Sequence, residues 1–467
     1  MSDQLEERPT TTHNQDTLSR LTDAHCHPND AFQGNDVARA ASQVGQLTIG
    51  KVCVMSSSLE SQAKTEELFR LQPQKVVPAF GLHPWFTSSI TLLDGAESGD
   101  QEFDKRAHYR EILVKKHYPT SSIGRSDTQQ EDERRRKDRM EIWEWIDCHL
   151  HLLPKPIRLE NFLVGLRQRL MRFPTSVMGE IGLDKAFTFH IKPSPVIHPT
   201  RGSNEKDDGD QPVTEDRVIK SKYKVSIGHQ LQILQKQIEL AIELRRPISL
   251  HCVQAPTELL GLIDELIGRW GVRFTGLLSN HQTTEKKSKT GPAQMGSENP
   301  TLQADSERDK DTTQEQGINL CWHSPNISVE VLQQTLRKLP RTAYFSYSSE
   351  LAILFDSRAP SNKAHPGLAQ PQCDETAVLD NKRYSTRAVQ AIRATPLDRL
   401  LLESDHGADP VLIDNKLQQI FHLVRVVKSP QSAGSSGLPS DDYSLDSHSD
   451  RLARQIEANW NRFYTGA

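Results

Sequence analysis

The stretch LTDAHCHPND, residues 21–30, places three polar side chains in a short apolar segment near the start of the chain. In a β-strand His25 and His27 point to the same side, because successive side chains alternate, while Cys26 points to the opposite side. A single buried histidine is more often a hydrogen-bonded core residue than a ligand. Two imidazoles side by side at the end of a strand favour metal binding. The segment therefore predicts a strand that ends in a candidate metal-binding pair.

Seven other apolar segments resemble the first, and segments with helical periodicity separate them. The predicted strands are 21–27, 47–55, 75–83, 176–184, 247–252, 318–323, 341–348 and 398–405. The clearest predicted helix is 229–246, whose apolar stripe stops before Pro247. The other predicted helices are 34–45, 59–72, 141–172, 256–268, 327–339, 384–395 and 411–428. Eightfold alternation of strand and helix favours an α/β fold, a (β/α)₈ TIM barrel, with a doubly wound open sheet as the alternative.

Six segments interrupt this alternation, because they are polar, rich in Ser, Gly, Pro, Asp, Gln and Lys, and lack an apolar period. They are residues 1–20, 95–140, 199–222, 283–317, 358–383 and 429–448. We predict a disordered tail over 1–20 and one barrel over 21–467, with the other five segments as insertions that lack packed cores. Within 95–140, the basic cluster EDERRRKDRM (131–140) alternates with acids, which favours a solvated start of a helix over a phosphate-binding patch.

Composition limits the possible partners and compartments. The 467 residues carry a net charge of −4, so the chain as a whole does not attract a polyanion. The six cysteines form no CxxC motif, and most lie in strand-like segments, as buried thiols do in a reducing compartment. The N-terminus has no apolar export segment, and no stretch of 18 apolar residues occurs. We expect a cytoplasmic or nuclear protein without a membrane segment.

Four of the later predicted strands carry a polar residue within the strand or at its end. Glu180 lies in an otherwise apolar strand, and His251, His323 and Asp405 each close one. In a parallel barrel these strand ends meet at one mouth, together with the first histidine pair. Nitrogen and oxygen ligands without thiolates suit a hydrolytic site with one or two divalent ions, which acidify water and polarise a phosphoryl or carbonyl oxygen.

Five motifs together resemble a known family. They are DAHCHP (23–28), GLHPWF (81–86), GEIGLD (179–184), PISLHC (247–252) and LLLESD (400–405). In this order they are similar to the motifs of the TatD-like metal-dependent deoxyribonucleases of the amidohydrolase superfamily, and the long insertions resemble its fungal branch. The resemblance implies a (β/α)₈ barrel that cleaves DNA phosphodiester bonds with a metal-activated water. One or two divalent ions, Mg, Mn or Zn, would serve as cofactors.

The resemblance also implies roles for single residues. The metal-binding set would consist of His25, His27, Glu180, His251, His323 and Asp405. Glu180 would bridge two ions and Asp405 would accept the proton of the attacking water, so both are candidate catalytic residues. His83 would lie beside the substrate, although Gly81 and Pro84 already explain a turn there. Asp184 could orient a ligand or cap a following helix.

The chain departs from the family pattern at two places. The family usually has an arginine where this chain has Val253, so a phosphate-binding fork is missing. After the sixth strand the family usually has a turn with serine and glycine, whereas HSPNIS (323–328) has Pro325 or Asn326 in place of the glycine. His281 also competes with His323 as the sixth-strand ligand, and we favour His323 because it lies between a clean strand and a helix. Two alternatives to a deoxyribonuclease therefore stay open. One is a barrel that binds protein partners through its insertions, and the other is a hydrolase of small cyclic amides.

Overall fold

Eight parallel strands form one sheet in the computed structural model, which describes residues 11–29, 36–93, 105–115, 129–191, 218–277, 316–350, 386–407, 409–429 and 443–466. The strands are β1 (Thr22–Cys26), β2 (Lys51–Met55), β3 (Val76–Phe80), β7 (Val177–Asp184), β11 (Ile248–Val253), β12 (Leu320–His323), β13 (Ala343–Tyr347) and β14 (Leu400–Leu402). They pair in this order, so each of the eight predicted strands is present and in sequence.

The sheet curls until its first and last strands meet. The backbone N–H of His27 donates to the carbonyl of His406 at 2.8 Å, and the N–H of Asp405 donates to the carbonyl of His25 at 3.0 Å. These bonds join the end of β1 to the segment that follows β14. The predicted barrel is therefore confirmed over the alternative of an open sheet, and it closes beside the first histidine pair.

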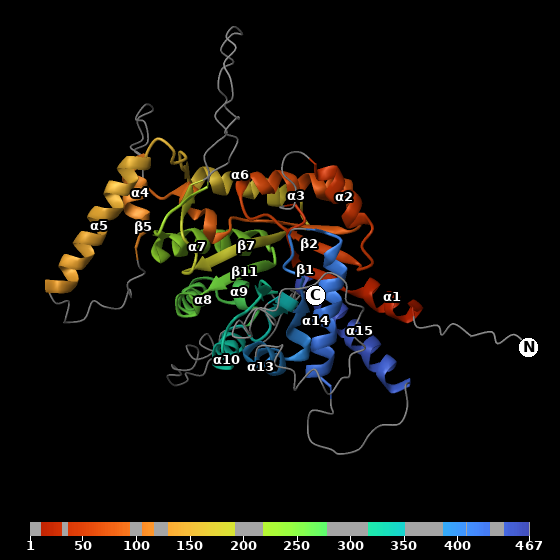
Figure 1. Ribbon diagram of the computed structural model, residues 1–467. Coiled ribbons are helices and arrows are strands. Elements are labelled where there is room, and N and C mark those ends of the chain that lie inside the picture. Colours follow the sequence, from red (N-terminus) through yellow and green to blue (C-terminus); the bar gives the residue numbers. More distant parts are fainter. Residues whose placement is uncertain are drawn as a thin grey trace, which may run out of the picture.

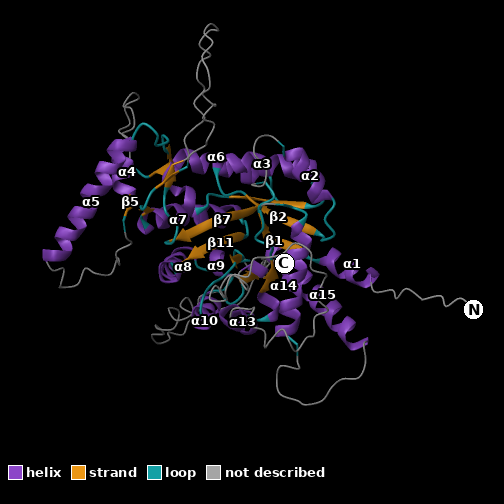
Figure 2. Ribbon diagram, in the orientation of Figure 1, coloured by secondary structure: helices purple, strands orange, loops and turns teal. Residues whose placement is uncertain are grey.

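Helices that alternate with the strands cover the outside of the barrel (Figure 1, Figure 2). They are α2 (Val37–Gly45), α3 (Leu59–Leu71), α6 (Leu159–Arg172), α7 (Ile227–Leu244), α8 (Pro256–Trp270), α10 (Val329–Lys338), α13 (Thr386–Ala394) and α14 (Leu412–Val427). Strand β2 shows how two cores arise from one alternating pattern. Val52 and Val54 belong to the core shared with the helices, whereas Cys53 and Met55 belong to the core inside the barrel.

The C-terminal helix α15 (Tyr443–Thr465) closes one end of the barrel. Trp460 and Phe463 join the inner core between the strands. The side-chain amide of Asn319, just before β12, donates to the carbonyls of Arg462 and Phe463 at 2.8 and 2.9 Å. This helix therefore covers the end at which the strands begin, and the mouth formed by the strand C-termini is the opposite end.

Helix α1 (Thr11–Arg20) packs against α15. Arg20 forms ion pairs with Asp450 and Glu457, at 3.8 and 3.5 Å, and Leu18 packs on the main core. The prediction that residues 1–20 form a disordered tail is wrong for 11–20, because contacts with a distant helix stabilise a segment that has little apolar pattern of its own. Residues 1–10 lie outside the described part of the chain.

The insertions build a second, smaller core beside the barrel. It is formed by α4 (Lys105–Ile112), β5 (Leu113–Val114), α5 (Gln129–His149), β8 (His190–Ile191), β9 (Ile219–Lys220) and β10 (Lys224–Val225). Tyr109, Ile146 and Tyr223 are buried in it. Figure 1 shows α4, α5 and β5 beyond the tips of β7 and β11. The prediction that 95–140 lacks a packed core is therefore wrong for residues 105–115, which supply Tyr109, Ile112 and Leu113 to this core. Of the predicted insertion 199–222 the structure describes 218–222, and of these only Ile219 packs partly against the second core.

The bounds of helix α5 differ from the predicted helix 141–172 but agree with the interpretation of the basic cluster 131–140. The predicted helix 141–172 is two helices, α5 and α6, separated by a segment that contains Pro154 and Pro156. Proline interrupts a helix because it lacks a backbone N–H and clashes with the preceding turn. The basic cluster 131–140 is helical and largely exposed, as the interpretation of a solvated start of a helix requires.

The other predicted insertions fall mostly outside the described residues, namely 283–315, 358–383 and 430–442. The prediction of an insertion over 429–448 is wrong for 443–448, which begin helix α15. Gly317, at the end of the predicted insertion 283–317, belongs to the fold. A Cβ atom at Gly317 would lie 2.3 Å from the backbone nitrogen of Gly276, so these two segments are in close contact.

In the described part of the chain, no helix combines the length and the apolar character that crossing a membrane requires.

Candidate metal centre

Glu180 of β7 lies at the centre of a buried cluster of imidazoles at the barrel mouth. Its Oε1 atom accepts hydrogen bonds from His251 Nδ1 at 2.9 Å and lies 2.9 Å from His323 Nε2. His83, which precedes the short helix η1 (Pro84–Ser89), places its Nε2 atom 3.2 Å from the same oxygen. Three segments that are distant in sequence thus converge on one carboxylate oxygen.

The second oxygen of Glu180 faces the first histidine pair. His25 Nε2 and His27 Nε2 lie 3.6 and 3.5 Å from Glu180 Oε2, and 3.9 and 3.8 Å from Asp405 Oδ1. The other ring nitrogen of His25 is hydrogen-bonded to Ser249 Oγ at 2.9 Å, which turns Nε2 toward the cluster. These contacts are longer than good hydrogen bonds, and His25 Nε2 is buried without a hydrogen-bond partner among the described residues.

The cluster offers three overlapping groups of ligand atoms, each within 4.8 Å. The groups are His25, His323 and Asp405; His25, His27 and Glu180; and His83, Glu180 and His251. All ligand atoms are imidazole nitrogens or carboxylate oxygens, a set that accepts zinc, manganese or magnesium. A buried imidazole nitrogen without a hydrogen bond, facing two carboxylates, is the arrangement that a bound cation satisfies. The residues therefore fit one or two divalent ions.

Burial and mutual attraction set the protonation of the cluster. Burial alone would raise the pKa of Glu180, but the surrounding imidazoles hold it well below its ordinary range. Burial would lower the pKa of His323, but the carboxylate of Glu180 raises it well above its ordinary value. Burial lowers the pKa of His25 to about 3 and raises the pKa of Asp405 to about 6. Without a bound cation, Glu180 is therefore negative, His323 carries a proton and His25 is neutral. A cation that binds His323 would have to displace this proton.

Glu403 is a supporting residue that the sequence reasoning missed. It is fully buried two residues before Asp405, and its Oε1 atom lies 3.7 Å from His323 Nδ1. Its carboxylate accepts hydrogen bonds from the hydroxyl of Ser346 and from the backbone N–H of Ser324 at 2.8 Å. A carboxylate behind a histidine fixes the ring orientation. The signal was present in the motif LLLESD, where Glu403 and Asp405 alternate along the chain.

Asp184 supports His251 from the other side. Its Oδ2 atom lies 3.5 Å from His251 Nε2 and accepts a hydrogen bond from Trp85 Nε1 at 2.6 Å. Its Oδ1 atom accepts the backbone N–H groups of Ala186 and Phe187 at 2.6 and 2.9 Å. No helix follows Asp184, so of the two predicted roles the helix cap is wrong, and the geometry favours orientation of His251.

Asp23, the third polar residue of the opening segment, stays outside the cluster. Its carboxylate accepts the backbone N–H of Ser404 at 2.9 Å and that of His25 at 3.1 Å. It therefore ties β1 to the segment after β14, where the barrel closes.

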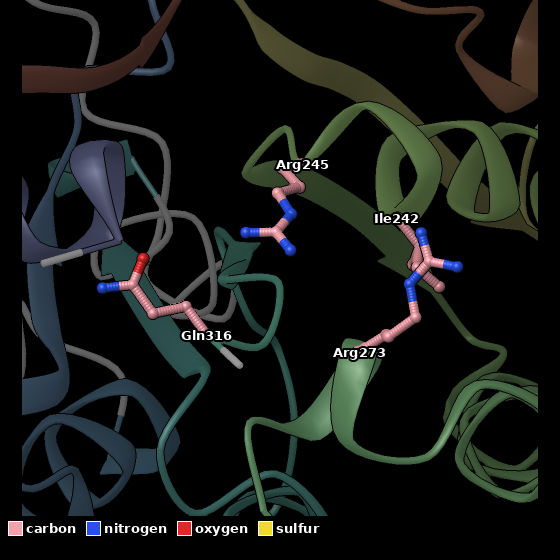
Figure 3. A pocket seen from close by; sticks show the side chains of 4 residues that line it. All are labelled: Ile242, Arg245, Arg273 and Gln316. Carbon is pink, nitrogen blue, oxygen red and sulfur yellow. The ribbon is translucent and has the colours of Figure 1, made fainter. Parts of the chain in front are cut away.

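A second hollow lies away from the mouth and is lined by Ile242, Arg245, Arg273 and Gln316 (Figure 3). None of these side chains is an imidazole or a carboxylate, so the hollow has no group that could bind a metal ion or move a proton near neutral pH. The cluster around Glu180 is the stronger candidate site.

The two departures from the family pattern have different outcomes. Val253 ends β11 next to Asp184 on β7 and is only partly buried, so an arginine side chain could extend from this position. His281 lies outside the described residues. His323 Nε2 lies 3.0 Å from His251 Nδ1. The two residues are therefore close enough to share an ion, as we expected when we favoured His323 over His281.

Comparison with known proteins agrees with this geometry. The sequence profile of the family described as "TatD related DNase" matches residues 22–359. The chain is 27% identical to the Cut9-interacting protein scn1 of Schizosaccharomyces pombe, over 88% of this chain and 94% of that protein. It is 26% identical to the uncharacterized deoxyribonuclease YMR262W of Saccharomyces cerevisiae, over 53% of this chain and 62% of that protein.

Among solved structures, the TatD homolog YjjV of Escherichia coli is 13% identical with a TM-score of 0.42, and the alignment covers 96% of this chain and 99% of YjjV. The match to the family profile extends from β1 to beyond β13, well over half of the chain. The chain belongs to the TatD related DNase family.

Proposed function

We propose that this protein is a metal-dependent hydrolase that cleaves phosphodiester bonds in DNA. The observation that supports this most strongly is the buried cluster around Glu180, where four barrel strands and the segment after β14 supply imidazoles and carboxylates to one point. The family description and the name of the S. cerevisiae relative both point to deoxyribonuclease activity. The family supports a hydrolase in general, and the choice of DNA as substrate is our proposal.

In this proposal the ligands would form two sets that both include Glu180. The first set would be His25, His27, Glu180 and Asp405, and the second would be Glu180, His251 and His323. When bound, the ions would polarise the phosphoryl oxygen of the substrate and make water more acidic. Glu403 and Asp184 would hold His323 and His251 in the orientation that this binding needs.

Asp405 is the carboxylate best placed to accept a proton from the attacking water. Its side chain is 30% exposed, whereas the Glu180 side chain is 5% exposed and surrounded by imidazoles. Ser324 Oγ donates to Asp405 Oδ2 at 3.2 Å, which leaves Oδ1 directed at the cluster. A general base must reach both the water and the solvent that finally takes the proton. His83, with Nε2 in the same cluster, can donate to Glu180 or to a substrate phosphate.

Digestion of a labelled single-stranded oligonucleotide tests this proposal. The full chain should shorten the oligonucleotide when Mg²⁺, Mn²⁺ or Zn²⁺ is added and should be inactive in a chelator. Hydrolysis of a cyclic amide without any cleavage of oligonucleotides would instead place the protein among the amidohydrolases. Cleavage that persists in the chelator would contradict the proposed role of the cluster.

A second candidate function is the binding of a protein partner. The S. pombe relative is named for an interaction with another protein and aligns with most of this chain. On α6, Val164 and Met171 lie seven residues apart and are 56% and 62% exposed, so they offer an apolar stripe. A barrel kept only for binding has no need of ions, so metal analysis of the purified protein discriminates between the two functions. Less than about 0.1 ion per chain would favour the binding role.

The compartment is inferred from the thiols. The described cysteines are free, and Cys26, Cys53, Cys252 and Cys321 are buried. Free thiols of this kind are typical of reducing compartments, so we propose the cytoplasm or the nucleus. Localisation of a fluorescent fusion of the full chain tests this.

A further inference from the structure

Three aromatic side chains form a continuous strip beside the metal-binding cluster. Trp85 of η1 and Phe187, in the loop after β7, stack with their ring centroids 4.7 Å apart and their planes 14° apart. Phe187 in turn meets His190 of β8 edge to face at 5.4 Å. Trp85 is 43% exposed, the largest aromatic side chain among the exposed apolar residues that the structure describes.

The strip begins at the cluster itself. The ring of Trp85 lies 4.7 Å from that of His83, whose Nε2 faces Glu180. Asp184 holds both members of the stacked pair, because it accepts the indole N–H of Trp85 and the backbone N–H of Phe187. One buried carboxylate thus fixes the position of the strip and contacts His251 as well.

The other end of the strip carries a positive charge. His190 pairs with Lys220 across the β8–β9 ladder, and Lys220 is exposed. No ion pair of Lys220 is found within the described ranges. An aromatic surface that begins at the metal-binding cluster therefore ends at a lysine.

Packing alone does not account for this arrangement. Around the second core Tyr109, Phe189 and Tyr223 are buried, whereas Trp143 and Trp145 are partly buried and pack against it. Trp85 differs from these residues in lying beside the metal-binding cluster, with 43% of its surface left exposed for a ligand to cover. A partner with flat, apolar faces and negative charge fits the strip and Lys220 together.

We propose that this strip binds unpaired bases of single-stranded DNA next to the scissile phosphate, while Lys220 contacts a backbone phosphate. This inference rests on the proposed function and specifies its substrate. In a duplex the neighbouring base pairs cover the faces of each base, so only unpaired bases can stack on Trp85 and Phe187. Base stacking on an aromatic side chain depends little on the kind of base, so the strip predicts little sequence preference.

Binding measurements with matched substrates test the inference. Fluorescence anisotropy would compare oligo-dT with an abasic oligomer of the same length, using the full-length Asp405→Asn protein with Mn²⁺, in which cleavage should be about 10²-fold slower. In that background we expect Trp85→Ala and Phe187→Ala each to weaken oligo-dT binding about 5- to 100-fold, and to change abasic binding less than about twofold. Met171→Ala, an exposed apolar residue on α6, is the matched control and should leave both unchanged.

Trp85→Phe separates stacking from support of the metal ligands. Phenylalanine keeps a ring for stacking but loses the N–H that Asp184 accepts. We expect Trp85→Phe to bind oligo-dT within about threefold of the parent. If Trp85 only positioned Asp184, Trp85→Phe would be as weak as Trp85→Ala and Phe187→Ala would be harmless. That result would overturn the inference.

Kinetics on the active protein distinguish failure of the strip from failure of the function. Trp85→Ala should lower kcat/KM for oligo-dT by a clearly larger factor than kcat/KM for the abasic oligomer, because only oligo-dT has bases that stack on the strip. If the wild type cleaves both substrates equally well and the variants match it, the strip inference is wrong and the nuclease proposal stands. If the wild type neither binds nor cleaves oligo-dT with any of the three metals, the proposed function is wrong, and this inference with it.

Discussion

At the scale of single residues, the candidate site depends on one buried carboxylate. Glu180 stays charged with almost no exposure because imidazoles from four other segments surround it. Isolated, such a charge would be strongly unfavourable in the barrel interior. Glu403 and Asp184, which were not among the predicted ligands, lie behind His323 and His251, whereas His25 is held by the hydroxyl of Ser249. Changes at this scale should therefore affect function more than folding.

Asp405→Asn tests the proposed proton acceptor. Asparagine has nearly the same shape but cannot accept the proton, and it is a weaker metal ligand, so kcat on oligonucleotides should fall about 10²-fold or more. Circular dichroism should show an unchanged fold, since Asp405 is 30% exposed. Ser324→Ala removes only the hydroxyl that donates to Asp405, so this variant should lose less activity than Asp405→Asn. Retention of more than about a tenth of the activity by Asp405→Asn would assign the proton to another group.

Val253→Arg tests the missing phosphate contact. The family pattern places an arginine at this position, and Val253 lies two residues after His251 on the same strand. A guanidinium can donate two hydrogen bonds to a phosphate, so KM for oligonucleotides should fall about tenfold. Val253→Lys is the control, because it adds the charge without the fork. If neither variant changes KM, the substrate phosphate does not pass this strand end.

At the scale of elements, two histidines connect the second core to the site. His108 of α4 donates through Nε2 to the carbonyl of Ser88 at 2.9 Å, and His229 of α7 donates to that of Thr87 at 3.0 Å. Both carbonyls belong to η1, the short helix that His83 caps. The insertion that forms α4 therefore helps to hold the segment that carries His83 and Trp85.

The buried His108 predicts a pH dependence of stability. Burial lowers the pKa of His108 from 6.5 to about 4. As the pH falls below 6.5 the unfolded chain takes up a proton that the folded chain does not accept until about pH 4, so stability decreases over this range. Between pH 7 and pH 5 the loss from this residue should be about 2 kcal/mol.

Urea unfolding of the metal-free protein, followed by tryptophan fluorescence, measures this loss. His108→Gln keeps an N–H donor for Ser88 and removes the titrating group. Its free energy of unfolding should decrease less than that of the wild type between pH 7 and pH 5. An equal decrease in both proteins would show that other groups account for the acid sensitivity.

At the scale of the whole molecule, the barrel closes at the site. The bonds that join β1 to the segment after β14 involve His25, His27 and Asp405, so the ligands lie along the seam of the sheet. An ion bound by these residues would hold the first and last strands together. Metal binding and folding should therefore be linked.

Thermal unfolding with and without metal tests this linkage. At a Zn²⁺ or Mn²⁺ concentration of about 100 times Kd, binding should stabilise the fold by ~2.7 kcal/mol, which corresponds to a rise in Tm of roughly 4 °C. His27→Ala should reduce the rise, whereas His151→Ala, an exposed histidine outside the cluster, should not. An equal rise in both variants would locate the metal elsewhere.

A deletion tests which segments the barrel requires. Gly317 lies against Gly276, so replacing residues 278–315 by a short Gly/Ser linker should rejoin neighbouring ends. We expect Tm to stay within about 3 °C of the wild type, and metal-dependent cleavage to persist although His281 is gone. Loss of metal binding in a folded deletion variant would favour His281 over His323 as a ligand.

The sequence alone determined the eight strands, their order and the residues at their ends. Side chains alternate between the two faces of a strand, so the sequence predicts which of them face the inside of the barrel. If the strands are parallel, their C-terminal ends lie at one mouth of the barrel, together with the residues His25, Glu180, His251, His323 and Asp405. The motifs also identified the family. The strands and the motifs are each defined by residues close together in the sequence, so the sequence is sufficient to predict them.

Only the tertiary structure decided the features that join distant segments. Helix α1 is stabilised by α15 at the other end of the chain, and the second core joins part of the polar insertion 95–140 to α5, β8 and β10. The strip likewise depends on Asp184 contacting Trp85, 99 residues earlier in the chain. The pattern of apolar residues along the chain does not predict these contacts. In each case a residue is buried or paired in charge by a segment that is distant in sequence and that only folding brings close.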